Sequence, residues 1–560
     1  MFTRIPYNDI VGYQPVFALT VIWGGQVYRF SQYPIEVKTS DNTLYTYTGG
    51  LDEFDFTEAS EVLGVNVEAN EVIVSCVFDG VDFLQEWARG NVLDGSEAEL
   101  SFFMVDNGTP VSTYDDRVVL FSGQIQQPIF GDPERPQGAV QFTVTSQVYQ
   151  SVRPLIDSNL LIDDRFDSRD KNSADGKIWP VVFGSAGSLR DNTGATVKIP
   201  STPAYAYYMD TSDPPPYTGW RVRFMVSWGY VQASNVTLWD SLGNNQVLAV
   251  NYDTDTYGNP FSYVVTDLAG PNEVITPIDF IHNTDLRPTS WWVSWHDGGG
   301  IINTQTNQPL GPAGDLCLWA LQRSGLPVDI QAWQNVSTVL NVYEFSGYIN
   351  DPTVSAWVWL QDNILPYLPI EVRSGPRGLY PILNTLYGVT HIKTVADITE
   401  GPTFSQIGPI ETQTETTDLI NHLTLLYSLD SHNDTYTQRV VAGHSYSDDV
   451  DNPSHYAVIS QNRYGTVKQT METRYIYNTD TAKHVANQII RQRALPVLTL
   501  DFVCTPDWGW LSVGDTITMS SDRLHMDKIT MLVVERTWQD GQWYYKMLFE
   551  VNPNIDKRAV

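Results

Sequence analysis

Basic residues, cysteines and long apolar runs are all scarce in this sequence, and each shortage argues against a class of protein. Only 33 Lys and Arg stand against 65 Asp and Glu in 560 residues, so the net charge is −32. Recognition of nucleic-acid phosphates needs a basic face, which makes sequence-specific nucleic-acid binding a poor fit. No apolar stretch reaches the roughly 18 residues of a membrane-spanning helix. Asp9 and Gln14 interrupt the segment where a secretory signal needs an apolar core, so we expect a soluble protein that is not exported by that route.

The three cysteines, Cys76, Cys317 and Cys504, lie far apart, each within an apolar stretch. An odd and scattered set does not make a disulfide framework. We therefore expect the protein to fold in a reducing compartment.

Enzyme signatures are also missing: the sequence has no phosphate loop, dinucleotide fingerprint, nucleophile elbow or zinc-protease motif. The acidic residues of 163–175 could bind Ca²⁺, but nearby basic residues neutralise them, and we interpret the stretch as a solvated linker. His444 and His455 lack an evident partner for a metal site and indicate a surface loop. Glu411 and Glu415 could serve as acid and base of a glycoside hydrolase, although 65 carboxylates produce such pairs by chance. We predict no catalytic residue, no metal and no cofactor.

Aromatic residues make up 12% of the chain, a composition that favours strands over helices. Short strands separated by turns predict an N-terminal β domain over residues 1–160, with one short helix near residues 82–89 that would cover the end of a barrel or sheet. A polar linker over residues 161–185 follows. The predicted fold class is mainly β (α+β), with several domains and few short helices.

A Trp-rich all-β insertion is predicted over residues 186–310. Flat aromatic faces stack on sugar rings and dominate protein contacts when they are exposed. The candidates for contact with a glycan or receptor are four tryptophans: Trp228, Trp291, Trp292 and Trp295. The alternative is that these side chains simply pack the core of a β domain.

Helical spacing appears mainly after residue 311. A second domain over residues 311–478 begins with a helix at 315–324, which Gly325 ends, and continues with a helix that Asp351 and Pro352 open. A hairpin is expected over 370–383. The last domain, 479–560, combines a helix at 481–493, capped by Asp480, with a C-terminal β-barrel that contains a hairpin signature near Gly541.

Several of these segments, in this order, resemble the central region of bacteriophage tail hub proteins, a family that includes the tail-tip proteins of long-tailed phages and of gene transfer agents. The resemblance covers roughly residues 1–184 and 312–551. The segments that carry it are 179–184 (Trp-Pro-Val-Val-Phe-Gly), 315–321, 354–360, the hairpin 370–382 and the run 511–517 with its Gly514-Asp515 turn.

The resemblance implies a structural virion protein without enzymatic activity. It implies a homotrimer at the distal end of the tail, in which paired β domains of three chains form a ring of pseudo-sixfold symmetry that continues or closes the tail tube. DNA would pass through this ring during ejection. The implied partners are a distal tail protein, the C-terminus of the tape-measure protein, and tail fibre or receptor-binding proteins. Assembly would take place in the cytoplasm of the host bacterium.

The sequence departs from the family pattern in its Trp-rich insertion and in the absence of a lysozyme or peptidase module. Two alternatives therefore stay open. The first is a receptor- or glycan-binding tail protein that acts through the insertion and a host surface glycan. The second is a polysaccharide hydrolase. The host, the tail type and the residues at each interface are not predictable from these patterns.

Overall fold

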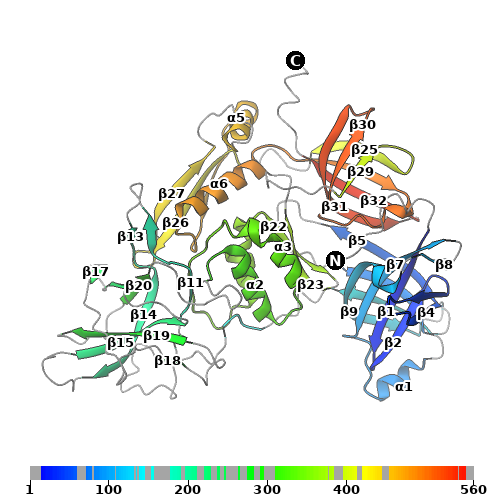
Figure 1. The fold of residues 1–560 in the computed structure, drawn as a ribbon, viewed down its shortest axis with the longest axis horizontal. Helices are drawn as coiled ribbons and strands as arrows, with labels where there is room; N and C mark the ends of the chain where they lie inside the picture. The colour runs from blue at the N-terminus through cyan, green and yellow to red at the C-terminus, as the bar shows by residue number, and fades with distance from the viewer. Residues whose placement is uncertain are drawn as a thin grey trace.

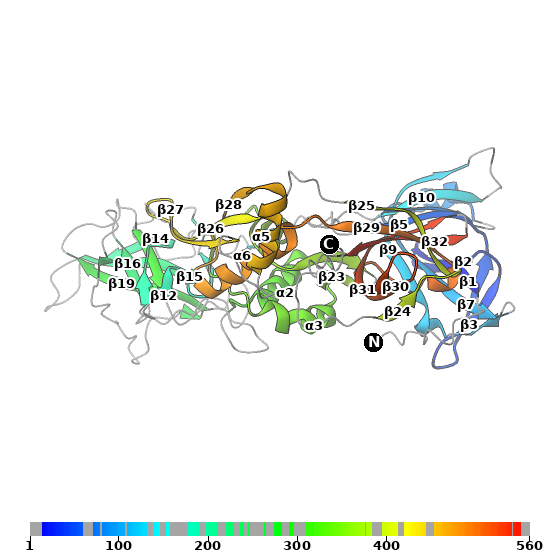
Figure 2. The same cartoon turned by 90° about the horizontal axis from the view of Figure 1, so that it is seen from above.

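In a computed structural model the chain is mainly β, as predicted, with several sheets and a few short helices. The description covers residues 14–59, 71–78, 81–106, 109–145 (except 112, 132, 133 and 135–137), 153–156, 177–190 (except 179), 196–210, 220–228, 236–239, 245–246, 263–264, 274–282, 291–295, 310–383 (except 376), 395–412, 419–443 and 453–549 (except 540). Among these residues, no helix combines the length and hydropathy needed to cross a membrane. The molecule is elongated, with the Trp-rich insertion at one end, β-barrels at the other and helices between them (Figures 1 and 2).

The N-terminal strands form a barrel. The hydrogen-bonded strands of this barrel follow the order β5, β6, β10, β9, β7, β1, β2 and β4. Gly50 closes the circle, because its N–H donates to Ser31 O at 3.1 Å and its carbonyl accepts from Val77 N at 2.8 Å. The strands are β1 (Gln14–Trp23), β2 (Gln26–Ser31), β3 (Ile35–Lys38), β4 (Leu44–Gly49), β5 (Leu51–Ala59), β6 (Glu71–Val77), β7 (Glu97–Asp106), β8 (Thr109–Pro110), β9 (Val118–Phe130) and β10 (Ala139–Thr145).

β1 is buried on both faces, which explains its nearly continuous apolar sequence. Phe17 and Leu19 point into the barrel core. Val16 and Ala18 point outward, where the β3–β4 hairpin covers them with Ile35 and other side chains in a second, smaller core. A strand that is covered on both sides loses the alternation of apolar and polar residues that marks a half-exposed strand.

The short helix predicted near residues 82–89 is present as α1 (Phe83–Ala88), and it lies at one end of the barrel (Figure 1). Asp82 caps it by accepting hydrogen bonds from the backbone N–H groups of Leu84 and Gln85. Phe83 stacks on Trp23 with ring centroids 5.5 Å apart. The helix therefore covers the barrel with the Phe83 ring and the edge contact of Trp87 with Phe130, while Leu84 and Trp87 stay 70% and 59% exposed.

The predicted C-terminal barrel is also present, but part of it comes from an earlier segment. Its strands follow the order β24, β30, β31, β32, β29 and β25, and a bridge between Gly401 and Phe404 links β24 back to β25. The predicted turn at Gly541 joins β31 to β32. The strands are β24 (Ala396–Thr399), β25 (Phe404–Thr412), β29 (Leu498–Cys504), β30 (Thr516–Ser521), β31 (Met526–Gln539) and β32 (Gln542–Phe549).

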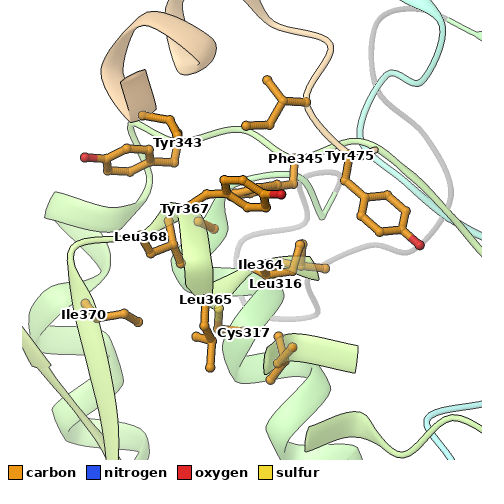
Figure 3. Close-up of a cluster of buried hydrophobic side chains, with 14 of the residues drawn as sticks. Leu316, Cys317, Tyr343, Phe345, Ile364, Leu365, Tyr367, Leu368, Ile370 and Tyr475 are labelled. Carbon is orange, nitrogen blue, oxygen red and sulfur yellow. The ribbon is translucent and has the colours of Figure 1, made fainter. Parts of the chain in front are cut away.

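A helical body lies between the barrels and the insertion, and one hydrophobic core fills it (Figure 3). Leu316 and Cys317 of its first helix are fully buried there with Phe345 and Ile364. The elements are α2 (Ala313–Ser324), α3 (Ile330–Leu340), β21 (Gly347–Ile349), α4 (Ala356–Asn363), β22 (Ile370–Gly375), β23 (Gly378–Leu383), β26 (His422–Asp430), β27 (Thr435–Ala442), α5 (Pro453–Tyr464), β28 (Lys468–Glu472) and α6 (Thr479–Arg493).

The three helices expected in this region are present, but two predicted caps are wrong. Gly325 ends α2 in the left-handed conformation, with φ of 79°. Ser355 caps α4 instead of Asp351, whose carboxylate accepts from Thr353 N at 2.8 Å in the preceding turn. Asn478 caps α6, two residues before the expected Asp480. Ser355 lies four residues after Asp351, and each actual cap accepts from backbone N–H groups two or three residues further along the chain.

The insertion is all-β where the structure describes it, and its sheet continues into the helical body. The order is β17, β16, β20, β14, β15, β11 and β21, and β21 belongs to the body. Part of this region and the polar stretch 163–175 lie outside the described residues. The strands are β11 (Val181–Phe183), β12 (Ser188–Arg190), β13 (Thr196–Lys198), β14 (Thr202–Asp210), β15 (Trp220–Trp228), β16 (Val236–Trp239), β17 (Asn245–Gln246), β18 (Tyr263–Val264), β19 (Val274–His282) and β20 (Trp291–Trp295).

Packing groups the second half of the chain differently from the boundaries predicted at 311–478 and 479–560. β24 and β25 belong to the C-terminal barrel. α6 instead joins the helical body, because Val485 and Ile489 share its core. The predicted boundary assumed that consecutive segments fold together, whereas the chain leaves the barrel after β25 and returns to it at β29.

Candidate functional site

The junction between the two barrels is the best-defined candidate site. β5 pairs antiparallel with the end of β31, so that Thr57 lies opposite Thr537 and Phe56 opposite Trp538. The two threonine hydroxyls are 3.1 Å apart and share a hydrogen bond. Backbone hydrogen bonds therefore run from one barrel into the other without interruption.

Aromatic rings pack across this junction. Phe17 of β1 lies 4.7 Å from Trp538 of β31, centroid to centroid, and 6.2 Å from Trp543 of β32. Phe56 meets Trp543 edge to face at 6.1 Å. Such pairs contribute about 0.5–1.5 kcal/mol each beyond the area they bury. Residues of both barrels consequently form a single hydrophobic core.

Arg536 of β31 places a charge inside this junction. The residue is 2% exposed, and its guanidinium carbon lies 5.1 Å from the Phe56 ring centre and 5.8 Å from that of Trp543. Its Nη1 donates to the backbone carbonyls of Gly509 and Leu511 at 3.4 and 3.3 Å. A buried arginine is tolerated when acceptors and ring faces surround it, and here they come from both barrels.

The junction was not predicted, although the sequence of β31 carries one signal for it. Four consecutive apolar residues, 531–534, precede Arg536 and are all buried. Met531 and Val533 face the common core, and Leu532 and Val534 face a smaller cluster with Val497. Such a run indicates a strand covered on both sides. It does not reveal which distant strand supplies the cover.

The tryptophans singled out for receptor contact occupy different environments. Trp291 and Trp295 of β20 are 5% and 0% exposed, so neither presents a ring face to solvent. Trp295 Nε1 donates to Gly184 O at 2.7 Å, which ties β20 to the end of β11, the strand that pairs with β21 of the body. For these two residues the burial favours the alternative that they pack the core of a β domain. The side chain of Trp228 lies outside the description.

Trp292 is the partly exposed member of the set, and it contacts the tip of the β26–β27 hairpin. Its ring meets His432 edge to face at 4.8 Å. The neighbouring Ser431 N donates to Pro200 O at 3.0 Å. This tryptophan therefore also helps to hold the insertion on the helical body.

The remaining candidates do not assemble into a site within the described residues. Glu411 is exposed on β25, and the acid near it is Asp501, whose pKa burial raises. Glu415 and His444 fall outside the description. His455, predicted in a surface loop, is buried in α5 against Tyr456.

The described residues contain no cluster of three or more His, Cys, Asp or Glu that could hold a metal ion. All three cysteines are buried free thiols whose pKa values burial raises. The structure thus offers no reactive thiol among them.

Comparison with protein-family models finds no match, and neither does comparison with curated proteins. Solved structures do align with this chain. A tail protein from Neisseria meningitidis MC58 aligns over 95% of this chain and 96% of its own, with 10% identity and a TM-score of 0.36. The 43 kDa tail protein of prophage MuSo2 from Shewanella oneidensis aligns over 96% and 99%, with 7% identity and a TM-score of 0.35. A chain in the virion of a native gene transfer agent particle aligns over 71% and 92%, with 11% identity and a TM-score of 0.36. Likeness at these values does not by itself establish a shared fold.

Proposed function

We propose that this protein is a structural subunit of a bacteriophage-type tail. Three copies would form a ring, and this ring would be the hub at the distal end of the tail. The ordered motifs at 315–321, 354–360 and 511–517 support this proposal. The observation that carries it is the barrel pair, in which β5 and β31 join two β-barrels of one chain into a continuous sheet with one core.

The barrel pair gives the proposal its geometry. Three chains with two barrels each supply six barrels, which suits a ring that continues a sixfold tube. In this proposal the ring-forming parts are residues 14–145 together with 395–412 and 498–549. Contacts between copies would be heterologous, with one surface of each chain meeting a different surface of the next.

The charge of the chain suits a channel for DNA. Residues 14–145 contain five Lys and Arg against twenty Asp and Glu. A wall that repels phosphate lets DNA slide, whereas a basic wall would hold it. In this proposal the hub has no catalytic role. Its neighbours are a distal tail protein, the end of a tape-measure protein and tail fibre or receptor-binding proteins, and it assembles in the host cytoplasm.

The test is the mass and shape of the purified protein. Light scattering should give three times 63.0 kDa, and negative-stain images should show a ring with a central opening. A monomer in solution calls for chemical cross-linking of intact particles, which should then yield a trimer. A chain that is monomeric in solution and cross-links only to other proteins in particles contradicts the hub. Receptor contact stays a prediction, and Trp292 is the partly exposed residue among the three candidate tryptophans whose side chains the structure describes.

A further inference from the structure

Exposed apolar side chains gather at the end of the N-terminal barrel that α1 covers. Trp87 and Leu84 of this helix are 59% and 70% exposed. Ile22 and Val27 lie directly opposite each other in the β1–β2 hairpin and are each 45% exposed, and the last residue of β1 stacks on α1. Large apolar side chains that gather in this way on a surface mark a site of protein contact.

This apolar end belongs to the acidic part of the chain. Glu97 of β7 lies opposite Ile22 in the sheet register and is exposed, and Glu86 lies on α1 itself. Residues 14–145 as a whole carry five Lys and Arg against twenty Asp and Glu. A surface that covers this end therefore needs an apolar centre with basic residues around it.

The end of α5 and the start of β28 form a surface of that kind on the same chain. Tyr464, the last residue of α5, is 38% exposed, and Arg463 and Lys468 are exposed on either side of it in the sequence. Residues 453–497 carry six Lys and Arg against two Asp and Glu, the opposite balance from the barrel. α1 and α5 lie on opposite sides of the molecule, at the bottom and the top of Figure 1, so two copies can bring them together but one cannot.

We propose that the α1 end of one copy binds the α5–β28 surface of a second copy, with Trp87 packed against Tyr464 and the acidic residues around it facing Lys468. Such a contact is heterologous, so it repeats from copy to copy and closes a ring where the rotation between copies permits. The inference rests on the proposed hub, which needs a contact of this type, and it assigns the residues. A second copy is favoured over another protein because this chain carries both complementary surfaces.

The test of the apolar half is the dissociation constant of the oligomer, measured by sedimentation of the full chain at increasing concentration. Trp87→Ala should raise this constant at least about tenfold, because loss of a central aromatic anchor commonly costs that much binding or more. Ile73→Ala is the matched control. Ile73 is 41% exposed in the wall of the same barrel, on β6, and its replacement should leave the constant unchanged.

The charged half of the contact has a separate test. Lys468→Glu should weaken association, and added salt should weaken association of the wild type, because the charges lie at the surface. Lys38→Glu, which reverses an exposed charge on β3, should not weaken it. Glu97→Lys combined with Lys468→Glu should recover part of the lost affinity, since opposite charges face each other again. A protein other than a second copy cannot produce this recovery.

Unchanged dissociation constants in Trp87→Ala and Lys468→Glu overturn the contact and leave the trimeric hub standing. A wild-type chain that stays monomeric in concentrated solution also overturns it, and cross-linking of intact particles then decides the hub by itself. A variant that assembles normally with itself but no longer joins particles shows that another protein covers α1, which equally overturns the proposal. If Trp87→Ala does not fold, Leu84→Ser tests the same surface, because Leu84 is the more exposed residue.

Discussion

Replacing Trp543 by alanine should destabilise both barrels together. The side chain is fully buried and contacts Phe17 and Phe56 of the N-terminal barrel as well as Trp538 of its own. Loss of a buried tryptophan costs about 3–5 kcal/mol. For a unit of roughly 200 residues each kcal/mol lowers Tm by about 2–4 °C, so the barrel pair should melt about 6–20 °C lower.

The assay is hydrogen exchange read by mass spectrometry during thermal unfolding, because peptides of β10 and β29 report the two barrels separately. Both should lose protection in one transition, and Trp543→Ala should move that transition as a whole. Trp333→Ala is the matched control, since Trp333 is as deeply buried but lies in the core of the helical body. If the variant lowers the transition of β29 while β10 stays unchanged, the reasoning about one shared core is refuted. Trp543→Phe gives a milder version if the alanine variant does not fold.

Two further predictions concern single residues. Gly378 has φ of +104°, and a Cβ there would lie 2.2 Å from the backbone of Pro327, so Gly378→Ala should lower the free energy of unfolding by at least about 2 kcal/mol in urea titrations. Gly408→Ala, at φ of +75° with open space around it, should cost about 1 kcal/mol, and equal losses in the two variants would refute the steric argument. Burial opposes the charge of Glu400, but hydrogen bonds from Ser521, Arg523 and Gln406 N outweigh it and lower its pKa. The stabilisation by Glu400 is therefore complete above the unfolded pKa of about 4.3 and is lost as pH falls through the lower folded value. The difference in the free energy of unfolding between wild type and Glu400→Gln should accordingly shrink below about pH 4. The same difference at pH 3 and pH 7 would contradict this prediction.

Local signals predicted local structure well. The helical spacing in 315–324 and 481–493 gave α2 and α6, and Gly325 marked the end of α2. The caps were harder, because Ser355 and Asn478 compete with neighbouring acids for the same backbone N–H groups. Only the position at which the backbone first turns helical decides between such candidates. α3 and α5 were not predicted.

Long-range pairing left no comparable trace. Nothing in the sequence of β5 or β31 identifies the other strand as its partner. The stretch 395–412 looks, by sequence, like part of the predicted domain 311–478 in which it lies. The partly buried or buried tryptophans of β20 show the same limit. Their number was visible in the sequence, but whether each ring faces solvent depends on neighbours such as Gly184 and His432, which come from distant segments.

The pairing of β5 with β31 also means that the two strands are synthesised at widely separated times. Thr57 and Thr537 are 480 residues apart, so at about 5–20 residues per second the first strand leaves the ribosome about half a minute to a minute and a half before its partner exists. During that time β5 has an unpaired end, and Phe56 lacks the indole that later covers it. An uncovered strand edge of this kind attracts wrong partners. A chain that stops before residue 526 can never cover it, so this strand pair distinguishes finished chains from unfinished ones.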